Sequence, residues 1–487
     1  MTLRAKVLSG LFWTGGTRLL SQVLTWVITI FVIRLLTPSD YGLLAMAMVM
    51  MGFLGILAEA GLGSAITQAA ELDDAILRRI FGVVIVVYGA LFALQFAMAP
   101  LVASFFDEGR LVLIVRVLAL HFLLSSFAVI PGALLNRRLD FRRQSMIGLA
   151  SAVTASLTSL ALAAAGYGVW ALIVSNLVAT ALVAVLVNLA CPFLRWPEFS
   201  LRGTRGLIVA GSQFTAQRAL YFAYSQADIF IGGRFFGKEL LGFYSIALHL
   251  ASLPVQRISS IVNQITFPAF AEARHEPRNV PSHMLMGIRI LSFFSFPVLW
   301  GMSSIADEIV AVVLGPKWGA SVVPLRLLSL VMPMTILGPF LNAAFQGIGH
   351  SQIVLKNALT AALILPAAFW IGAHSGLLGL SMAWVVGFPI VLFSNLRRML
   401  PMVGLRIESV LGAAMRPAAA GLGMYGCVAL ARWLLADRVS ALLMMGALIV
   451  VGATAYALIT LLINKTGVRE VIGLFRRRPA GGKAAPS

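Results

Sequence analysis

The chain is built from long apolar stretches that follow one another almost without interruption. Segments such as 83–98 and 441–463 are apolar on every face, and the longer ones reach the roughly twenty residues that a helix needs to cross a bilayer. Strands of a membrane barrel would instead alternate polar and apolar residues over runs of about ten. Because backbone groups inside a bilayer must be hydrogen-bonded within the structure, the sequence predicts an all-α polytopic membrane protein.

Hydropathy predicts about fourteen membrane spans. The composition agrees, because 60% of the 487 residues are apolar and only 11% are charged, whereas a soluble domain carries about 25% charged residues. The spans are expected near 11–36, 41–69, 80–104, 111–135, 144–166, 168–192, 207–234, 240–270, 284–305, 318–345, 354–374, 376–398, 410–436 and 440–463.

Basic residues gather in alternate loops and in the tail RRRPAGGK. The net charge of +19 therefore sets the orientation of the spans, and no nucleic-acid partner is expected. The positive-inside rule makes these loops and both termini cytoplasmic. The opposite loops are too short to form an external catalytic domain. Cys191 and Cys427 have no spacing suited to metal ligation, and we expect no metal, no cofactor and no catalytic residue.

The strongest internal signal is a repeat. A shift of about two hundred residues superposes RLLTPSDYGLLAMA on RFFGKELLGFYSIA, which pairs Gly42 with Gly242. A slightly longer shift sets VRVLALHFLL beside LRLLSLVMPM. Each half then holds six spans in the same orientation, related by a parallel pseudo-two-fold axis, with a cavity between the halves. The predicted parts are an N-terminal lobe at 1–200, a C-terminal lobe at 201–400, an extra helix pair at 401–463 and a basic cytoplasmic tail at 464–487.

Several predicted spans carry arginines and amides where apolar residues are expected. A charge at the centre of a span costs about 2.5–3.5 kcal/mol on insertion scales, so such groups tend to face an interior pathway. Arginine binds phosphate oxygens in pairs and stays charged when partly desolvated. These patterns predict a wet, cationic cavity suited to a diphosphate headgroup. The candidate substrate-binding residues are Arg18, Gln22, Gln217, Arg218, Tyr221, Arg257 and Gln264.

Two alternatives stay open for the charged residues. Arginines near span ends, among them Arg289, Arg326 and Arg432, can extend to the membrane interface or pair with a nearby acid. The intramembrane acids Glu59 and Asp228 are candidates for ion coupling, and a structural ion pair across helices explains them equally well.

The chain also resembles a known family. Its motifs are RLLTPSDYGLLAMA at 34–47, AEAGLGSAITQ at 58–68, LLNRRLDFRR at 134–143, FPAFAEA at 267–273 and QGIGHS at 346–351. These are similar to the Wzx-type polysaccharide flippases of the multidrug/oligosaccharidyl-lipid/polysaccharide exporter superfamily, close to the WzxC-like branch. The resemblance covers nearly the whole chain.

This resemblance implies a transporter with two helical lobes that alternates access in a bacterial inner membrane. It implies that an undecaprenyl-diphosphate oligosaccharide moves from the cytoplasmic to the periplasmic leaflet for exopolysaccharide, capsule or O-antigen synthesis. The expected partners are the lipid-linked oligosaccharide, membrane lipids, a polysaccharide polymerase and a chain-length regulator. Family members often have an aspartate before GLG, where this chain has Glu59 and Ala60.

Two other functions fit the sequence less well than a flippase. A membrane polymerase or ligase would need a sizeable loop domain or a carboxylate cluster, and the short outward loops offer neither. A cation-coupled drug exporter would need acidic cavity residues to hold hydrophobic cations, whereas the deep charges here are mostly basic.

Overall fold

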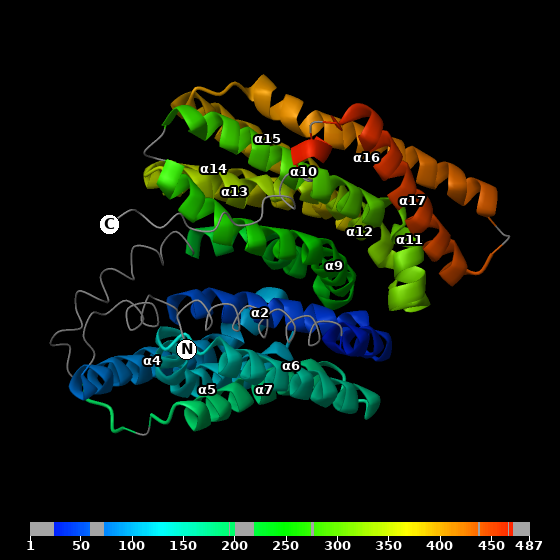
Figure 1. Ribbon diagram of the computed structural model, residues 1–487. Helices are drawn as coiled ribbons and strands as arrows, with labels where there is room; N and C mark the ends of the chain where they lie inside the picture. The colour runs from blue at the N-terminus through cyan, green and yellow to red at the C-terminus, as the bar shows by residue number, and fades with distance from the viewer. Residues whose placement is uncertain are drawn as a thin grey trace, which may run out of the picture. The chain divides into compact units, whose positions relative to one another are not determined.

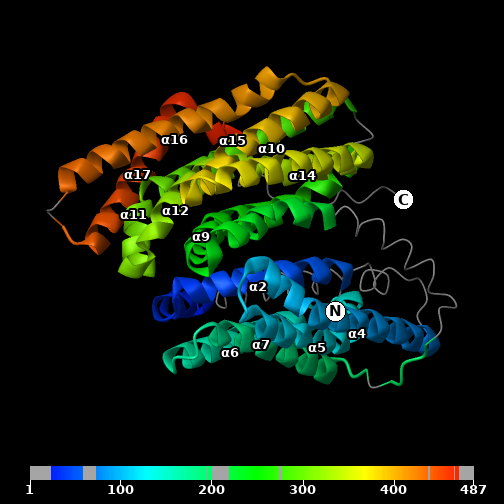
Figure 2. The same cartoon turned by 180° about the vertical axis from the view of Figure 1, so that it is seen from behind.

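A computed structural model describes residues 24–58, 73–193, 195–199, 219–273, 277–436, 439–465 and 467–470. Every regular element within these ranges is a helix, and eleven helices are long and apolar enough to cross a membrane. The molecule is therefore an all-helical, multi-pass membrane protein, as the sequence predicted (Figure 1 and, from behind, Figure 2).

The eleven spans follow the predicted order. Of the other predicted spans, 11–36 overlaps a short apolar helix at Leu24–Leu35, 207–234 is described only from residue 219 onward, and 240–270 lies in α9. The chain divides into two compact units, Met1–Ser245 (unit 1) and Ile246–Ser487 (unit 2). This division falls within α9, and the predicted lobe boundary at 200–201 stays a prediction.

Within its described residues, unit 1 contains five long helices before α9. Two of them have a first turn stabilised by a side-chain cap: the Asp73 carboxylate accepts a hydrogen bond from the Ile76 N–H at 2.6 Å, and Asp140 accepts one from the Arg143 N–H at 3.1 Å. Such caps satisfy amides that a helix leaves unpaired. The helices are α2 (Pro38–Ala58), α4 (Asp74–Phe106), α5 (Leu111–Arg137), α6 (Phe141–Ala164) and α7 (Val169–Ala190).

Unit 2 continues from α9 (Ala227–Ala273) into a second set of spans. One predicted span, 318–345, is formed by several short helices in succession within Pro316–Gly347. The remaining elements are η1 (Pro277–Asn279), α10 (Val280–Ser304), α11 (Ala306–Ile309), η2 (Val310–Leu314), η3 (Pro316–Ser321), α12 (Val322–Thr335), α13 (Leu337–Gly347), α14 (Ser351–Ala373), α15 (Gly376–Met399), η4 (Leu400–Val403), α16 (Ile407–Leu435) and α17 (Ala441–Ile463).

Helices pair in the same way in the two units. In unit 1, α4 packs on α5, α5 on α7, and α6 on α7. In unit 2, α10 packs on α12, α12 on α15, and α14 on α15. The order of the partners along the chain is the same, so the repeated sequence produces a repeated packing pattern.

In each repeat the helical backbone is broken between the first and second predicted spans, and the two breaks lie at corresponding positions. In the first repeat Thr37 caps α2, because its N–H and hydroxyl donate to Asp40 Oδ2 at 2.9 and 2.7 Å and the Asp40 N–H is 3.4 Å from the Thr37 hydroxyl. This reciprocal arrangement is a capping box. Two hundred residues later, Gly237 has φ 71° and interrupts α9, a backbone conformation that glycine adopts without a steric penalty.

The extra helix pair packs on unit 2. Helix α16 lies against α10, and α17 lies against α16. Tyr456 of α17 donates a hydrogen bond to the Phe293 carbonyl at 2.8 Å, and Arg432 of α16 binds both carboxylate oxygens of Glu308, at 2.8 and 2.7 Å. Packing and polar contacts thus attach the pair along the length of α10 and at α11.

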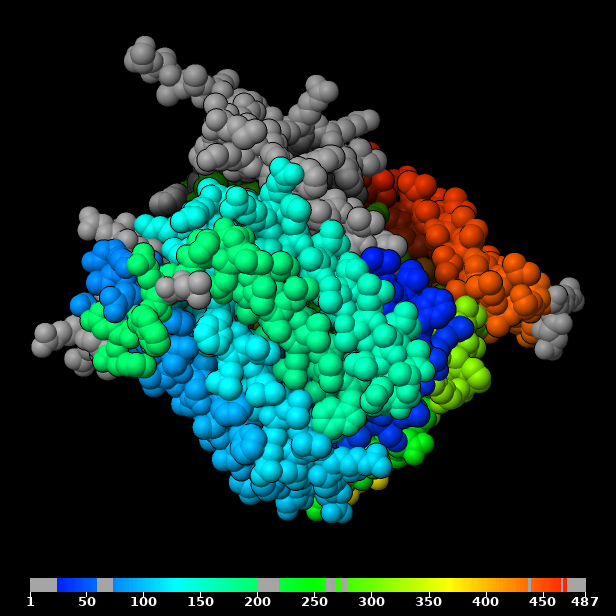
Figure 3. Space-filling view, turned by 90° about the horizontal axis from the view of Figure 1, so that it is seen from below, coloured from blue at the N-terminus to red at the C-terminus, as the bar shows by residue number. Residues whose placement is uncertain are grey.

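One face of unit 1 suits a lipid environment. Figure 3 shows this face, over which the side chains of α4–α7 form a continuous surface. Large apolar side chains of these helices are exposed on unit 1, including Phe127 at 53%, Leu157 at 53% and Leu189 at 73%. Exposed apolar area of this extent marks a surface that contacts membrane or a partner. Because these helices are long and apolar enough to cross a membrane, contact with lipid is enough to explain the exposed side chains.

A substitution in the α14–α15 hairpin tests the packing. A Cβ at Gly379 would overlap the backbone carbonyl oxygen of Gly372, which cannot move without separating the two helices. We expect Gly379→Ala to destabilise the detergent-solubilised protein by about 1–3 kcal/mol, measured as a lower midpoint of thermal unfolding. In the matched control Gly412→Ala, the added Cβ meets open space, and the midpoint should stay the same or rise. Equal midpoints for the two variants would contradict the close backbone contact.

Candidate functional site

Most residues of the predicted cationic cavity lie outside the described residues. These are Arg18, Gln22, Gln217 and Arg218, and the candidate ion-coupling acid Glu59 also lies outside them. The structure therefore does not test whether they meet, and their role in binding or ion coupling stays a prediction. Within the described ranges, no group of three or more histidines, cysteines or acids could hold a metal ion.

Two predicted residues lie on the long second part of α9. Arg257 is exposed, and its neighbour Gln256 is exposed and donates from Nε2 to the Ser252 hydroxyl at 3.2 Å. The backbone of Gln264 is helical, but its side chain lies outside the described part of the chain. Arg257 is fifteen residues beyond Gly242, which corresponds to about 22 Å at a rise of about 1.5 Å per residue. Arg257 is thus far from the break in α9, as its place inside a predicted span requires.

Tyr221 belongs to an aromatic pair. Its ring and that of Tyr224 meet edge to face, with centroids 5.3 Å apart and an angle of 72° between the rings. Tyr221 is 53% exposed. An exposed ring fixed by a neighbour offers a flat apolar surface with a polar tip, which is suited to contact with a sugar ring.

Asp228 is completely buried and has specific partners. Its carboxylate accepts a hydrogen bond from the Tyr244 hydroxyl at 2.7 Å and one from the Ile229 N–H at 2.8 Å. Asp228 and Tyr244 lie on opposite sides of the Gly237 break in α9. The carboxylate therefore links the two parts of this helix, and its proposed part in ion coupling stays a prediction.

Two repeat-related glycines, among those the structure describes, allow a very close approach of backbone in unit 1. A Cβ at Gly42 would overlap the carbonyl oxygen of Lys238, and a Cβ at Gly242 would overlap the carbonyl oxygen of Pro38. Both the glycines and the carbonyl-bearing residues differ by two hundred positions, so the contact is reciprocal. The sequence repeat identified the glycine pair but not that its members lie side by side.

An ion pair and stacked rings lie beside this contact. Lys238 Nζ is 2.5 Å from Glu108 Oε2, in the short turn between α4 and α5. Phe105, at the end of α4, stacks on Phe230 with centroids 4.2 Å apart. The pairing of Glu108 with Lys238 was not predicted, because a contact across 130 residues has no local sequence signature.

The carboxyl of Glu108 has an altered pKa. Burial, the largest single effect, would raise the pKa, but the hydrogen bond and charge of Lys238, together with the N–H and charge of Arg110, outweigh it. The pKa of Glu108 is therefore lowered from its ordinary value, and the ion pair is fully formed at neutral pH.

Three arginines near span ends pair with acids, as the structural alternative predicted. Arg289 binds Glu470 with its Nε 2.9 Å and its Nη2 2.5 Å from the carboxylate oxygens. Arg326 binds Asp307, and Arg432 binds Glu308. A fourth, Arg116, places its guanidinium 4.7 Å from the centre of the Phe96 ring.

The sequence matches the family model of the polysaccharide biosynthesis proteins over residues 31–323. The chain belongs to the polysaccharide biosynthesis protein family. The predicted resemblance to Wzx-type flippases is thereby confirmed.

Similar proteins match most of the chain. The succinoglycan biosynthesis transport protein ExoT of Rhizobium meliloti is 25% identical over 473 residues, which cover 93% of this chain and 92% of that protein. The teichuronic acid biosynthesis protein TuaB of Bacillus subtilis is 25% identical over 78% of this chain and 79% of its own. The lipopolysaccharide biosynthesis protein WzxC of Escherichia coli is 24% identical over 79% of each.

Solved structures share the fold at low identity. The lipid II flippase MurJ in an inward closed conformation superposes with a TM-score of 0.77 at 13% identity, covering 94% of this chain and 99% of that one. A multidrug resistance MATE family transporter of the MOP superfamily in an inward-facing conformation gives a TM-score of 0.63 at 18% identity, covering 79% and 94%. The prediction of a transporter rather than an enzyme is confirmed.

Substitutions of the reciprocal glycines test the contact in this family member. We expect Gly42→Ala and Gly242→Ala each to lower stability by about 1–3 kcal/mol, because each new Cβ meets backbone. The double variant should lose less than the sum of the two, since either substitution alone separates the same contact. The measurement is thermal unfolding, with Gly55→Ala, whose Cβ meets open space on the same helix, as control. Fully additive losses would contradict a shared contact.

The Glu108–Lys238 pair predicts a pH dependence. A carboxyl with a lowered pKa stabilises the fold above its ordinary value of 4.5, and this contribution is lost as the pH falls through the lowered value. Wild type should therefore be more thermostable than Glu108→Gln at pH 7, and the difference should shrink on acidification. The exposed neighbour Glu239 is the control, and Glu239→Gln should have little effect. A pH-independent difference between wild type and Glu108→Gln would refute the ion pair's contribution.

Proposed function

We propose that this polysaccharide biosynthesis transport protein flips an undecaprenyl-diphosphate-linked oligosaccharide repeat unit from the cytoplasmic to the periplasmic leaflet. The supporting observation is the family match over residues 31–323, joined to a fold shared with a lipid II flippase. Membership gives polysaccharide biosynthesis as the process, and the fold is one on which a lipid-linked sugar is already known to be moved. The proposal places the protein in the bacterial inner membrane, with both termini cytoplasmic.

The headgroup would cross through a cationic cavity. In this proposal Arg18, Arg218 and Arg257 bind the diphosphate, because a guanidinium binds phosphate oxygens through paired, charge-assisted hydrogen bonds. The amides of Gln22, Gln217 and Gln264 and the ring of Tyr221 contact the sugars. The three arginines paired with acids near span ends are assigned no such role, because their charges are already compensated.

The polyprenyl tail would stay in the bilayer throughout. The large apolar side chains exposed on α5–α7 are compatible with lipid along the whole span, and no enclosed apolar channel is required for the tail. Only the polar part then has to cross, which limits the cost of translocation to desolvation of the headgroup.

Access would alternate through contacts near the predicted periplasmic ends of the spans. The Gly42–Gly242 contact and the Glu108–Lys238 pair join residues of the two sequence repeats there, so opening to the periplasm would require both to separate. In this proposal Glu59 and Asp228 are the candidate ion-coupling acids. A polysaccharide polymerase and a chain-length regulator would act on the delivered unit.

The decisive experiment removes the proposed phosphate-binding charges. We expect Arg218→Ala and Arg257→Ala to abolish polymer export in a deletion strain, while the protein stays in the membrane at wild-type abundance. Lysine at either position should restore part of the export, because it keeps the charge but loses the paired hydrogen bonds. The readouts are secreted polysaccharide and lipid-linked repeat units accumulated in the membrane.

A surface arginine supplies the matched control. Arg195 pairs with Asp74 at 3.3 Å in an exposed loop, so Arg195→Ala removes the same charge and should leave export unchanged. Normal export in both cavity variants would rule out the phosphate-binding role of these arginines. Export lost equally in Arg195→Ala would point to a general effect of charge removal and would also count against it.

A further inference from the structure

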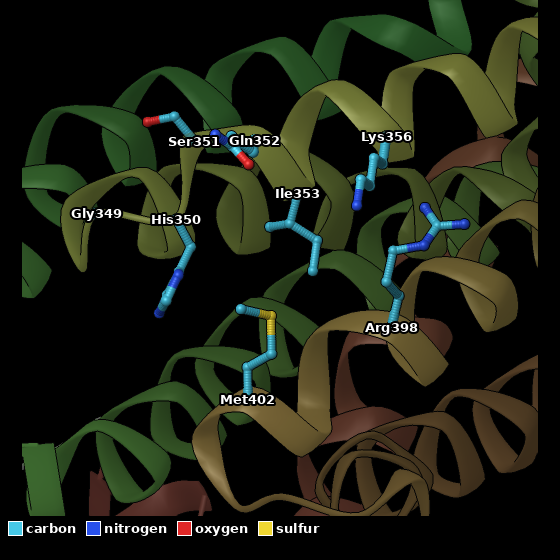
Figure 4. A pocket seen from close by; sticks show the side chains of 8 residues that line it. All are labelled: Gly349, His350, Ser351, Gln352, Ile353, Lys356, Arg398 and Met402. Atoms are coloured by element: carbon cyan, nitrogen blue, oxygen red, sulfur yellow. The ribbon is translucent and has the colours of Figure 1, made fainter.

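Unit 2 contains a cavity of about 400 Å³ at the turn between α13 and α14. Figure 4 shows that its walls come from this turn, the first two turns of α14, the end of α15 and the following η4. Its volume lies within the range of about 300–1,000 Å³ typical of small-molecule sites. The cavity is lined by Gly349, His350, Ser351, Gln352, Ile353, Lys356, Arg398 and Met402.

Cationic and hydrogen-bonding groups line this cavity, and none of the lining residues is acidic. Lys356 and Arg398 extend toward one another from α14 and α15 (Figure 4). Two like charges on packed helices repel each other unless an anion lies between them. Within the part of the chain that the structure describes, neither side chain forms an ion pair, in contrast to Arg289, Arg326 and Arg432.

The guanidinium of Arg398 is held in place by neutral groups. Its Nη1 donates to Asn357 Oδ1 at 2.9 Å, and its Nη2 donates to the Thr360 hydroxyl at 3.1 Å. Asn357 is itself buried, with its Nδ2 2.9 Å from Met399 Sδ. The charge is thus positioned at the cavity wall by hydrogen bonds that leave it uncompensated, which is the arrangement of a pre-organised anion site.

The other repeat provides an internal comparison. The turns before α6 and α14 have the same backbone hydrogen bonds, from residues 138, 139 and 140 in one and 348, 349 and 350 in the other. Asp140 places a carboxylate at the start of α6 and pairs with Arg143 at 3.3 Å. His350 holds the corresponding place before α14 and makes no capping bond. At this turn unit 1 has the Asp140 carboxylate beside Arg143. Unit 2 instead has a cavity lined by the cations Lys356 and Arg398.

We propose that this cavity binds a phosphate group. Lys356 and Arg398 would balance its charge, and the hydroxyl of Ser351, the amide of Gln352 and the first amides of α14 would donate hydrogen bonds. The loops that form the cavity are predicted to be cytoplasmic, where phospholipid headgroups, lipid-linked diphosphates and free phosphate are all present. The phosphate is the shared chemistry, and none of the lining residues is among those assigned to the proposed translocation cavity.

Binding to the purified full-length protein tests the site. The probes are a short-chain phosphatidylglycerol, a short-chain polyprenyl diphosphate and inorganic phosphate, each titrated and followed by native mass spectrometry. We expect wild type to bind at least one of them, and Lys356→Gln, Arg398→Gln and their double variant to bind it at least about tenfold more weakly, since each removes a charge-assisted contact.

A neighbouring arginine is the matched control. Arg397 does not line the cavity and places its guanidinium 5.3 Å from the centre of the Phe393 ring, so Arg397→Gln removes equal charge and should change affinity less than about twofold. Lys356→Glu, at an exposed position, is a second variant that reverses the charge on one side of the cavity and should also weaken binding at least about tenfold. Unchanged melting temperatures establish that the variants are folded.

The outcomes distinguish the possible sources of the phosphate. They also distinguish a failure of this site from a failure of the flippase proposal. Binding of phosphatidylglycerol alone identifies a bilayer lipid, binding of the polyprenyl diphosphate alone identifies a lipid-linked sugar carrier, and displacement by inorganic phosphate supports recognition of the phosphate itself. No binding of any probe by wild type, or equal loss in Arg397→Gln, overturns the site. Export assays of the same variants report on translocation separately, so this site can fail while the flippase proposal stands.

Discussion

The absence of water in the bilayer core is the constraint on which the rest of this structure depends. Backbone groups that cannot bond to water must bond within their own helix, so every long apolar stretch becomes a span. Helices in lipid gain little from hiding apolar surface from one another, and their association relies on close packing and on polar contacts. The reciprocal approach at Gly42 and Gly242 and the Gly372–Gly379 crossing are both of this kind.

The same constraint explains how much of the fold was predictable. Span length and hydropathy are local properties, so the spans seen as helices could be placed from sequence, and the two-hundred-residue repeat anticipated the matching pairs of packed helices. The contact between Pro38 and Gly242 was not predictable, because it depends on where two distant helices meet. The break in α9 at Gly237, which has a positive φ, lies between the predicted spans 207–234 and 240–270, but the chain resumes its helix at once and does not form a loop there.

Charges were harder to interpret than apolar residues. A sequence shows that an arginine lies in a span but not whether an acid far along the chain meets it. Arg432 and Glu308 are 124 residues apart and Arg289 and Glu470 are 181 apart, and the structure compensates these charges internally. In the sequence, nothing separates Lys356 and Arg398 from the other basic residues near span ends. What sets them apart is that α14 and α15 bring both to one cavity that has no acidic lining residue. This can be seen only in the three-dimensional structure.

The two repeats share a backbone plan but differ in chemistry at matching positions. A side-chain cap at Thr37 and a glycine at 237 both break the helix at the same step of the repeat. Asp140 and His350 both follow a residue with positive φ, Leu139 and Gly349, yet one supplies a carboxylate and the other leaves space. A duplicated scaffold that had to preserve only its fold could keep the same solution twice. Divergence at the ends of corresponding helices, where backbone geometry is preserved, instead indicates that the two halves place their charges differently.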